Sequence, residues 1–579
     1  MPKKQLNDLY TPTGERLAAQ PNATPWDVYP RPQMRRDSYL NLNGWWDFTV
    51  TVDGESAPTE FTESIRVPFC PECLLSGVHR VPADGSHLWY RRTFVLPEGF
   101  KKDRVLLHIG AADQTAWAYV NDRYVGEHSG GYDPFVLDIT DVLADENTID
   151  IQVTDHLKDA ILPYGKQKYN RGGMWYTPVS GIWQTVWLES VPTEHVRSLS
   201  TVVTEDGVTI IAEGVSDGVV TVRTPGGNLL TPLQDGRAEL AIPEPRLWCP
   251  DDPYLYEYVV ETADDRVESY FALRTLDIRH IHGIPRMCLN GKPLFIHAVL
   301  DQGYWSDGLF TPATPEDYRW DISEMKRLGF NTLRKHIKIE PQQFYYECDR
   351  LGMLVWQDMV NNGRYSFLRD TALPTVGLKR LADKHLHRNP KSRAAFIASM
   401  ERTVEQLDAH PCIIGWTIFN EGWGQFDSDN VYWRLRQLDT TRFIDTASGW
   451  FKGAQSDVVS EHVYFKPYRF VRGEKPVFLS EFGGYSYKPT GHVSNTDQTY
   501  GYRLYDQADK YMDDLEWLYL MEIIPAVKEG LCGAVYTQLS DVEDETNGLV
   551  SYDRRVCKVD EKRMQDIAAA LYKQMEESE

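Results

Sequence analysis

The chain has 579 residues and a formal net charge of −23 at pH 7, with 42% hydrophobic and 25% charged residues. This length exceeds what a single hydrophobic core supports, so three or four domains are expected. The acidic balance argues against nucleic-acid binding, which needs clustered lysine and arginine. No run of about twenty apolar residues occurs, so we expect no membrane span.

The first residues indicate a cytoplasmic protein, because no apolar run follows Lys3 and Lys4 as it would in a secretory signal. Eight cysteines are scattered through the chain. Cys70 and Cys73 have the spacing of a metal or redox half-site, but no second such pair accompanies them. We therefore interpret the cysteines as structural thiols in a reducing compartment.

The first half of the chain reads as β-structure. Short apolar or alternating runs, such as 105–109 and 256–261, are separated by turn residues such as Gly226 and Gly227. No helix-length periodicity appears between them. The pattern predicts two β-sandwich domains, residues 1–190 and residues 191–275, rather than one large sandwich.

From about Leu276 onwards, short apolar runs alternate with amphipathic segments of helical length, which is typical of βα units and a parallel sheet. Residues 276–579 are therefore predicted to form a (β/α)₈ barrel, although its fifth and sixth helices are weakly marked. The eight expected strands are 293–299, 330–334, 353–357, 413–419, 443–446, 458–464, 476–480 and 533–538. The expected helices are 315–328, 341–351, 392–409, 506–528 and 562–577.

Two carboxylates lie at the carboxyl ends of predicted strands, where the active site of a (β/α)₈ barrel is found. Glu421 follows the fourth expected strand and Glu481 follows the seventh, and glycines come soon after each. A single such residue would be read as an exposed loop carboxylate, but two on facing strands are harder to dismiss. Paired carboxylates about 5–5.5 Å apart hydrolyse a glycosidic bond with retention, one as acid and one as nucleophile.

Short motifs along nearly the whole chain carry a family resemblance. They are segments 42–48, 89–94, 181–187, 247–250, 253–256, 331–336, 348–352, 420–421 and 480–483. In these motifs the chain resembles glycoside hydrolase family 2, the family of β-galactosidases, β-glucuronidases and β-mannosidases. The resemblance implies a jelly-roll sandwich, an immunoglobulin-like sandwich and a TIM barrel, in that order. It implies a retaining exo-β-glycosidase without a cofactor, with Glu421 as proton donor and Glu481 as nucleophile.

Further substrate-binding residues are expected around the pair. By the resemblance, Asn420 belongs to the acid/base motif, Arg334 supports the nucleophile, His336 lines the sugar site and Tyr464 bonds the nucleophile. Other candidates follow strand ends in this sequence, although a core or rim position is an equal or better interpretation for each tryptophan. They are Asp301, Trp305, Trp423, Trp450 and His462. His462 is as readily interpreted as a residue behind those that contact the sugar.

Several departures from the family pattern affect which sugar we expect the enzyme to cleave. Residues 547–553 contain no lysine where relatives that cleave glucuronides carry Asn-x-Lys, so a buried sugar carboxylate would stay unpaired. Residues 536–538 replace a tryptophan that lies beneath the pyranose ring of the sugar in many relatives. Residues 360–363 show no counterpart of the magnesium ligands of known β-galactosidases. We therefore expect no catalytic metal and a neutral, galactose-configured β-glycoside, pyranoside or furanoside. β-Glucuronidase and β-mannosidase remain alternatives.

Two interpretations from other classes fit the sequence less well. A catalytically inactive carbohydrate-binding protein would have lost one carboxylate, and both are present. A metal-dependent hydrolase would need ligands converging at strand ends, for which only His297, Asp301, His336 and His462 are available. The expected partner is a glycoside or oligosaccharide, with no nucleic acid and no membrane; a homo-oligomer is possible.

Overall fold

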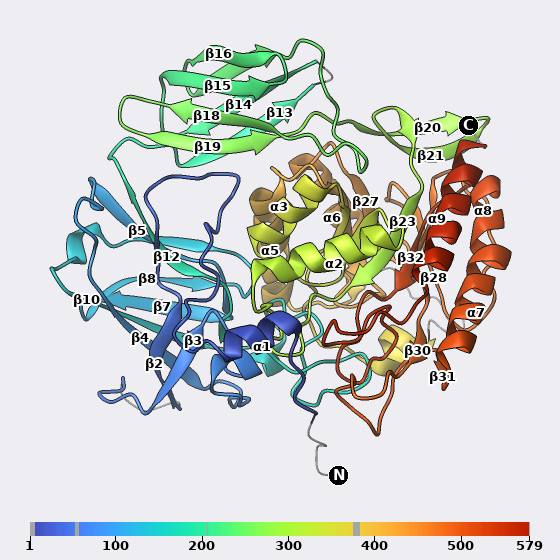
Figure 1. Ribbon diagram of the computed structural model, residues 1–579, viewed down its shortest axis with the longest axis horizontal. Coiled ribbons are helices and arrows are strands. Elements are labelled where there is room, and N and C mark those ends of the chain that lie inside the picture. Colours follow the sequence, from blue (N-terminus) through green and yellow to red (C-terminus); the bar gives the residue numbers. More distant parts are fainter. Residues whose placement is uncertain (1–5, 53–56, 205, 374–382, 578–579) are drawn as a thin grey trace.

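The computed structural model describes residues 6–52, 57–204, 206–373 and 383–577, and it consists of two β-sandwiches followed by a parallel barrel (Figure 1). In Figure 1 the first sandwich is blue and lies on the left, and the second is green and lies at the top. The barrel, from yellow to red, fills the rest of the view. The predicted fold class is confirmed.

The first sandwich pairs a four-stranded sheet with a six-stranded one. Burial alternates along its strands, so that in β7 every second residue faces the core between the sheets. A short helix, α1 (Pro12–Ala18), precedes the first strand. The smaller sheet has the order β1 (Leu40–Asn41), β12 (Val186–Val191), β5 (Arg104–Ile109), β9 (Phe135–Asp138). The larger has the order β3 (Glu63–Val67), β2 (Gly44–Thr51), β4 (His87–Phe94), β10 (Asn147–Thr154), β7 (Thr115–Val120), β8 (Arg123–Ser129).

The second sandwich has its own core, formed by buried aliphatic and tyrosine side chains. A three-stranded antiparallel sheet then leads into the barrel. The two sheets of the sandwich are β13 (Ser198–Val203), β14 (Gly207–Glu213), β17 (Arg237–Ala241), and β16 (Gly227–Leu233), β15 (Gly218–Thr224), β18 (Tyr256–Glu261), β19 (Arg266–Phe271). The connecting sheet is β20 (Leu276–Ile281), β21 (Ile284–Leu289), β22 (Lys292–Pro293).

The barrel has eight parallel strands, and all eight were predicted. Seven of them are buried along their whole length, which explains the nearly continuous apolar sequences of strands such as Ile413–Asn420 and Leu531–Thr537, whereas in Val459–Val463 only alternate residues are buried. The sheet opens between its end strands, where Ser460 Oγ donates to Asp445 Oδ1 at 2.9 Å across the seam. The order is β27 (Phe443–Ser448), β26 (Ile413–Asn420), β25 (Leu354–Asp358), β24 (Thr332–Lys335), β23 (Ile296–Asp301), β32 (Leu531–Thr537), β29 (Val477–Gly483), β28 (Val459–Val463).

Helices surround the barrel on most sides (Figure 1). Capping side chains define several starts; Asp560, for example, accepts a hydrogen bond from the Arg563 N–H. Segments 449–458 and 464–476, after β27 and β28, contain no helix, in agreement with their weak sequence signal. The helices are α2 (Pro315–Arg327), α3 (Gln342–Leu351), α5 (Pro390–Leu407), α6 (Ser428–Leu438), α7 (Ala508–Leu518), α8 (Ile524–Glu529) and α9 (Glu561–Glu576).

Helix α6 was not predicted. Its N-cap residue, Asp427, has φ +40° and makes no capping hydrogen bond, so the usual start signal is missing. Only a few of its residues are buried, among them Val431, Tyr432 and Leu435, so its apolar stripe is short. No helix in the described part of the chain is long and apolar enough to cross a membrane.

A buried arginine, Arg36, links the two β-sandwiches. Arg36 Nη1 donates to Glu189 Oε1 of β12 at 2.9 Å, and Arg36 Nε donates to Asp265 Oδ1, which precedes β19, at 2.9 Å. All three side chains are at most 3% exposed. Burial raises the pKa of Asp265, but the Arg36 guanidinium more than compensates and holds this pKa below its usual value. The two sandwiches therefore share one charge network.

Replacing Arg36 with alanine is expected to lower the free energy of unfolding by about 3–5 kcal/mol, because the buried carboxylate of Asp265 would lose its cation and Glu189 would keep only Arg31. Urea unfolding of the variant and the wild type measures this difference. Arg223→Ala is the control: its pair with Glu257 is well exposed, so a change within about 1 kcal/mol is expected. Equal effects of the two substitutions would contradict the role of the buried network.

Candidate active site

Arg334 lies at the centre of the site, at the end of β24. Its Nη1 donates to the Ser480 carbonyl at 2.8 Å and to Glu481 Oε1 at 3.1 Å. Its Nη2 donates to Asn420 Oδ1 at 2.9 Å, and its Nε donates to Asp358 Oδ1 at 3.1 Å. The side chain is fully buried. One guanidinium thus ties together the ends of β24, β25, β26 and β29.

Glu481 is held as a carboxylate. Its Oε2 accepts a hydrogen bond from the Tyr464 hydroxyl at 2.5 Å, while Oε1 faces Arg334. Burial raises the pKa of Glu481, but the opposing charges of His462 and Arg334, with the Tyr464 hydrogen bond, outweigh burial and lower this pKa to about 2. Sequence reasoning placed Glu481 after a strand, whereas β29 continues through it to Gly483.

Glu421 immediately follows β26 and has φ +51°, a left-handed backbone that is rare for a residue with a side chain. Its N–H donates to the Ser448 carbonyl at 2.9 Å. Gly424, at φ +64°, completes the turn, since a Cβ there would lie 2.4 Å from the Asn362 carbonyl oxygen. Conformations of this kind cost energy and cluster at functional sites.

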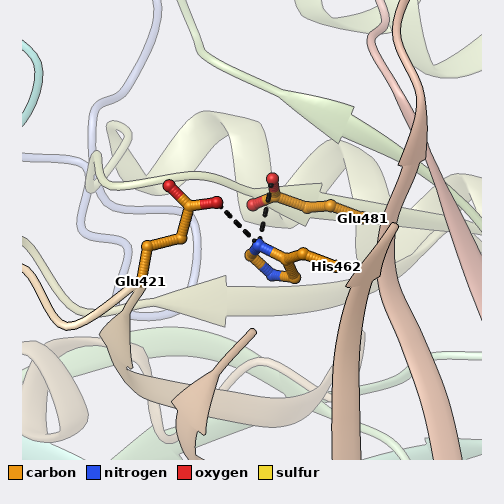
Figure 2. A group of neighbouring side chains, drawn as sticks. All are labelled: Glu421, His462 and Glu481. Atoms are coloured by element: carbon orange, nitrogen blue, oxygen red, sulfur yellow. Dashed lines mark hydrogen bonds and ion pairs between the residues drawn. The ribbon is translucent and has the colours of Figure 1, made fainter. Parts of the chain in front are cut away.

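His462, from β28, lies between the two glutamates (Figure 2). Its Nδ1 is 2.9 Å from Glu421 Oε1 and 3.4 Å from Glu481 Oε2. One donor atom from each of the three residues lies within 4.8 Å of the others, a spacing that a metal site would also have. However, both Glu481 oxygens already accept hydrogen bonds, Oε1 from Arg334 and Oε2 from Tyr464. The three residues are therefore better described as an acid–base cluster than as a metal site.

His336 lies on the other side of Arg334. Its Nδ1 is 2.7 Å from Asp358 Oδ2, which also contacts Arg334. Burial lowers the pKa of His336 to about 4, although the Asp358 carboxylate acts in the opposite direction. The ring is therefore neutral at neutral pH, with its Nδ1 proton directed at Asp358. Asp358 was missed as a site residue, although it is a carboxylate at the end of an apolar strand.

Two of the predicted tryptophans lie beside this cluster. Trp450 meets the His462 ring edge-on at a centroid distance of 5.6 Å. Trp423 lies 6.3 Å from the His336 ring and 5.4 Å from the ring of Trp175. Trp175 comes from the first sandwich domain and was not predicted.

The segment 160–176 brings further residues of the first domain to the barrel mouth. The Tyr164 hydroxyl donates to the Gly363 carbonyl at 2.7 Å, after β25. The Lys166 ammonium lies 5.8 Å from the Trp423 ring centre, and its charge contributes to the lowered pKa of His336. This segment is long, lacks regular strands and is rich in aromatic and basic residues, a pattern that signals a functional loop.

The loop after β32 carries buried acids that pair with the same segment. Arg171 forms ion pairs with Glu543 and Asp544, at 3.7 and 3.4 Å. The Tyr176 hydroxyl donates to Glu545. Burial raises the pKa of Glu543 to about 7. This side of the mouth is thus acidic, and Arg171 is already paired with two of its acids.

Three predicted candidates make their contacts with residues other than Glu421 and Glu481. Asp301 Oδ2 accepts from Lys335 Nζ at 2.6 Å. The Trp305 ring lies under the Arg554 guanidinium, at 4.1 Å. His297 Nδ1 lies 3.0 Å from the Gly329 carbonyl oxygen, and its ring stacks on Phe330. These residues do not converge with His336 and His462, so this set does not support the metal-dependent alternative.

Comparison with known proteins places the chain in a family. Residues 75–192 match the sugar binding domain model of glycosyl hydrolases family 2, residues 193–274 match a second model described as glycosyl hydrolases family 2, and residues 282–562 match the TIM barrel domain model of the family. Together these matches cover most of the chain.

Relatives have low sequence identity. A β-galactosidase of Thermoanaerobacter pseudethanolicus is 26% identical over 438 residues, 70% of this chain and 54% of that enzyme. A β-glucuronidase of Bacteroides fragilis is 22% identical over 514 residues, 82% of this chain and 70% of that enzyme. The chain thus spans about half the length of the first of these relatives.

Solved structures show the same fold. A β-D-glucuronidase of Dictyoglomus thermophilum superposes with a TM-score of 0.71 at 17% identity, covering 94% of this chain and 98% of that one. A family 2 β-galacturonidase of Eisenbergiella tayi superposes with a TM-score of 0.66 at 20% identity, with the same coverage. The three matched domains, in the order found in the structure, show that this chain belongs to glycoside hydrolase family 2.

Proposed function

We propose that the protein is a retaining exo-β-glycosidase in which Glu481 is the nucleophile and Glu421 the acid/base. The observation that carries this proposal is the paired geometry: oxygens of the two carboxyl groups lie within 4.8 Å of each other, a distance suited to retention rather than inversion. The first-domain segment 160–176 borders the mouth, and we infer that it limits the site to a terminal sugar.

In the first step the Glu481 carboxylate attacks the anomeric carbon, the bond to the leaving oxygen breaks, and that oxygen takes the proton of Glu421. In the second step Glu421 takes a proton from water, whose oxygen displaces Glu481 from the anomeric carbon. Two inversions leave the configuration retained. Arg334 and Tyr464 stabilise the Glu481 carboxylate before the first step and after the second.

His336 is suited to position a sugar hydroxyl. Because the Nδ1 proton is directed at Asp358, the neutral ring leaves Nε2 as a hydrogen-bond acceptor. An acceptor held by a buried carboxylate has a fixed direction. We therefore assign His336 and Asp358 to substrate orientation, whereas Arg334 orients the nucleophile and Asn420.

Alanine substitutions are expected to separate the two catalytic roles. Glu481→Ala should lose turnover on all aryl β-glycosides, and azide should restore part of it by replacing the nucleophile. Glu421→Ala should reduce kcat/KM about 100-fold or more on phenyl glycosides but far less on dinitrophenyl glycosides, because only poor leaving groups need the proton. Steady-state rates across a leaving-group series measure both effects, and the opposite dependence would reverse the assignment.

Tyr464→Phe is expected to move the acid limb of kcat/KM to higher pH. The Tyr464 hydroxyl stabilises the ionised form of Glu481, so its loss raises the pKa of Glu481 from about 2. Activity needs the ionised form and is therefore lost earlier as pH falls. Tyr502→Phe, which keeps the ring stacked on Tyr464 at 3.7 Å, is the control and should leave the acid limb in place. An unchanged limb in Tyr464→Phe would exclude this role.

For the sugar, we propose a neutral, galactose-configured β-glycoside. Residues 541–545, in the loop after β32, include four acids, and the cations bonded to them are already paired: Lys558 with Asp541, and Arg171 with Glu543. A sugar carboxylate bound beside these four acids would meet negative charge. A ring-form preference is not assigned, and the β-galactosidase relative supports the galactose configuration.

A second candidate, hydrolysis of a β-uronide, is favoured by one observation. Within the described residues, the Lys166 ammonium forms no hydrogen bond or ion pair, although the residue is 7% exposed and lies over the rings of Tyr176 and Trp423. A buried free cation suits a carboxylate ligand. The β-glucuronidase relative and the uronidase structures are consistent with this candidate.

Matched substrates decide between the two. We expect kcat/KM for a nitrophenyl β-galactoside to exceed that for the corresponding β-galacturonide at least about tenfold, a difference of about 1.4 kcal/mol. Lys166→Met should leave this ratio within about threefold. A preference for the uronide that disappears in Lys166→Met would instead establish the second candidate. A second comparison, between the β-glucoside and the β-glucuronide, tests the sugar configuration.

A further inference from the structure

The contacts of His462 extend beyond the two glutamates. On the far side of its ring, Nε2 lies 3.0 Å from Ser448 Oγ. Ser448 Oγ donates to Ser480 Oγ at 2.9 Å, and Ser480 Oγ donates to the Glu461 carbonyl at 3.2 Å. The chain of hydrogen bonds therefore ends at a carbonyl, which can only accept.

This end point sets the direction of the whole chain. Since the Ser480 proton goes to a carbonyl and the Ser448 proton goes to Ser480, Ser448 Oγ must accept from His462. His462 Nε2 thus carries a hydrogen, as a fixed hydrogen bond on one ring nitrogen determines the tautomer. If Nδ1 were unprotonated, its lone pair would face both carboxyl groups of the glutamate pair (Figure 2).

The groups around the ring favour a hydrogen on Nδ1 as well. Oxygens of two carboxyl groups face this nitrogen, Glu421 Oε1 at 2.9 Å and Glu481 Oε2 at 3.4 Å. On this side the cation among the groups described is Arg334, which is already paired with Asp358 and Glu481. A hydrogen on Nδ1 would therefore meet a carboxyl acceptor on each glutamate.

We infer that His462 is a positioning residue for the acid: it donates its Nδ1 proton to Oε1 of Glu421, which leaves the other oxygen, Oε2, to carry the proton for the leaving group. Oε1 is committed at 2.9 Å, and Oε2 makes no hydrogen bond among the described residues. When Oε2 loses its proton to the leaving oxygen, the Nδ1–H stabilises the new carboxylate. This inference rests on the proposed function and adds a residue to it.

The structure holds the ring firmly in this role. The His462 side chain is fully buried, and Trp450 packs edge-on against it. Gly449 makes room for the ring, because a Cβ there would lie 2.8 Å from His462 Nδ1. The ring cannot turn away from Glu421 without breaking its bond to Ser448.

The test compares glutamine with methionine at position 462, since the two side chains are similar in size and only glutamine has an N–H donor. kcat/KM is measured for aryl β-glycosides from phenyl to dinitrophenyl. We expect His462→Met to lose about 100-fold on the phenyl glycoside and less than about tenfold on the dinitrophenyl glycoside, as Glu421→Ala does. His462→Gln should recover most of the phenyl activity.

Tyr464→Phe is the matched control, because it acts on the nucleophile and should lower kcat/KM by similar factors on all substrates. Equal losses across the series in His462→Met, or no recovery with glutamine, would overturn the inference while Glu421→Ala still supports the proposed function. If Glu421→Ala itself shows no leaving-group dependence, the proposed function fails instead. If the position-462 variants do not fold, Ser448→Ala provides the test: a steeper leaving-group dependence of about 3–10-fold supports the inference, and an unchanged one overturns it.

Discussion

The arrangement of the site depends on one buried cation. Arg334 is fully buried, and its hydrogen bonds reach Asp358, Asn420, Glu481 and a backbone carbonyl on three other strands. Burying a guanidinium costs several kcal/mol, which only such a complete set of partners offsets. Because each partner lies at or near the carboxyl end of a strand, the same contacts that stabilise the cation also determine where the mouth of the barrel carries these polar groups.

The two glutamates differ because their surroundings differ. Glu481 lies within a strand and receives hydrogen bonds from Arg334 and Tyr464, so its charge is stabilised where it stands. Glu421 lies one residue beyond its strand, on a left-handed backbone, and its side chain is 13% exposed compared with 6% for Glu481. His462 contacts both. A barrel with eight similar strand ends thus builds two unlike carboxyl groups from local geometry.

The site is not a property of the barrel alone. The segment 160–176 of the first sandwich domain contributes Trp175 and Lys166 to the mouth and pairs Arg171 with the loop after β32. These contacts link the mouth of the barrel to the packing of the domains, which Arg36 in turn stabilises through β12 and the second sandwich. Under the proposed function, we therefore expect specificity to depend on residues more than 200 positions away in sequence from Glu421 and Glu481.

The sequence alone was enough to predict the eight strands, most of which contain apolar runs because they are buried on both faces, and the two carboxylates at or just beyond the carboxyl ends of two of them. It could not reveal α6, which lacks a capping signal, or the place of Asp301 and Trp305, whose partners Lys335 and Arg554 are chosen by packing. Nor could it relate His462 to Ser448 and Ser480, or bring segment 160–176 to the barrel. Periodicity and turn chemistry are local, whereas hydrogen-bond direction, charge pairing and contacts between domains exist only once distant parts of the chain are placed together.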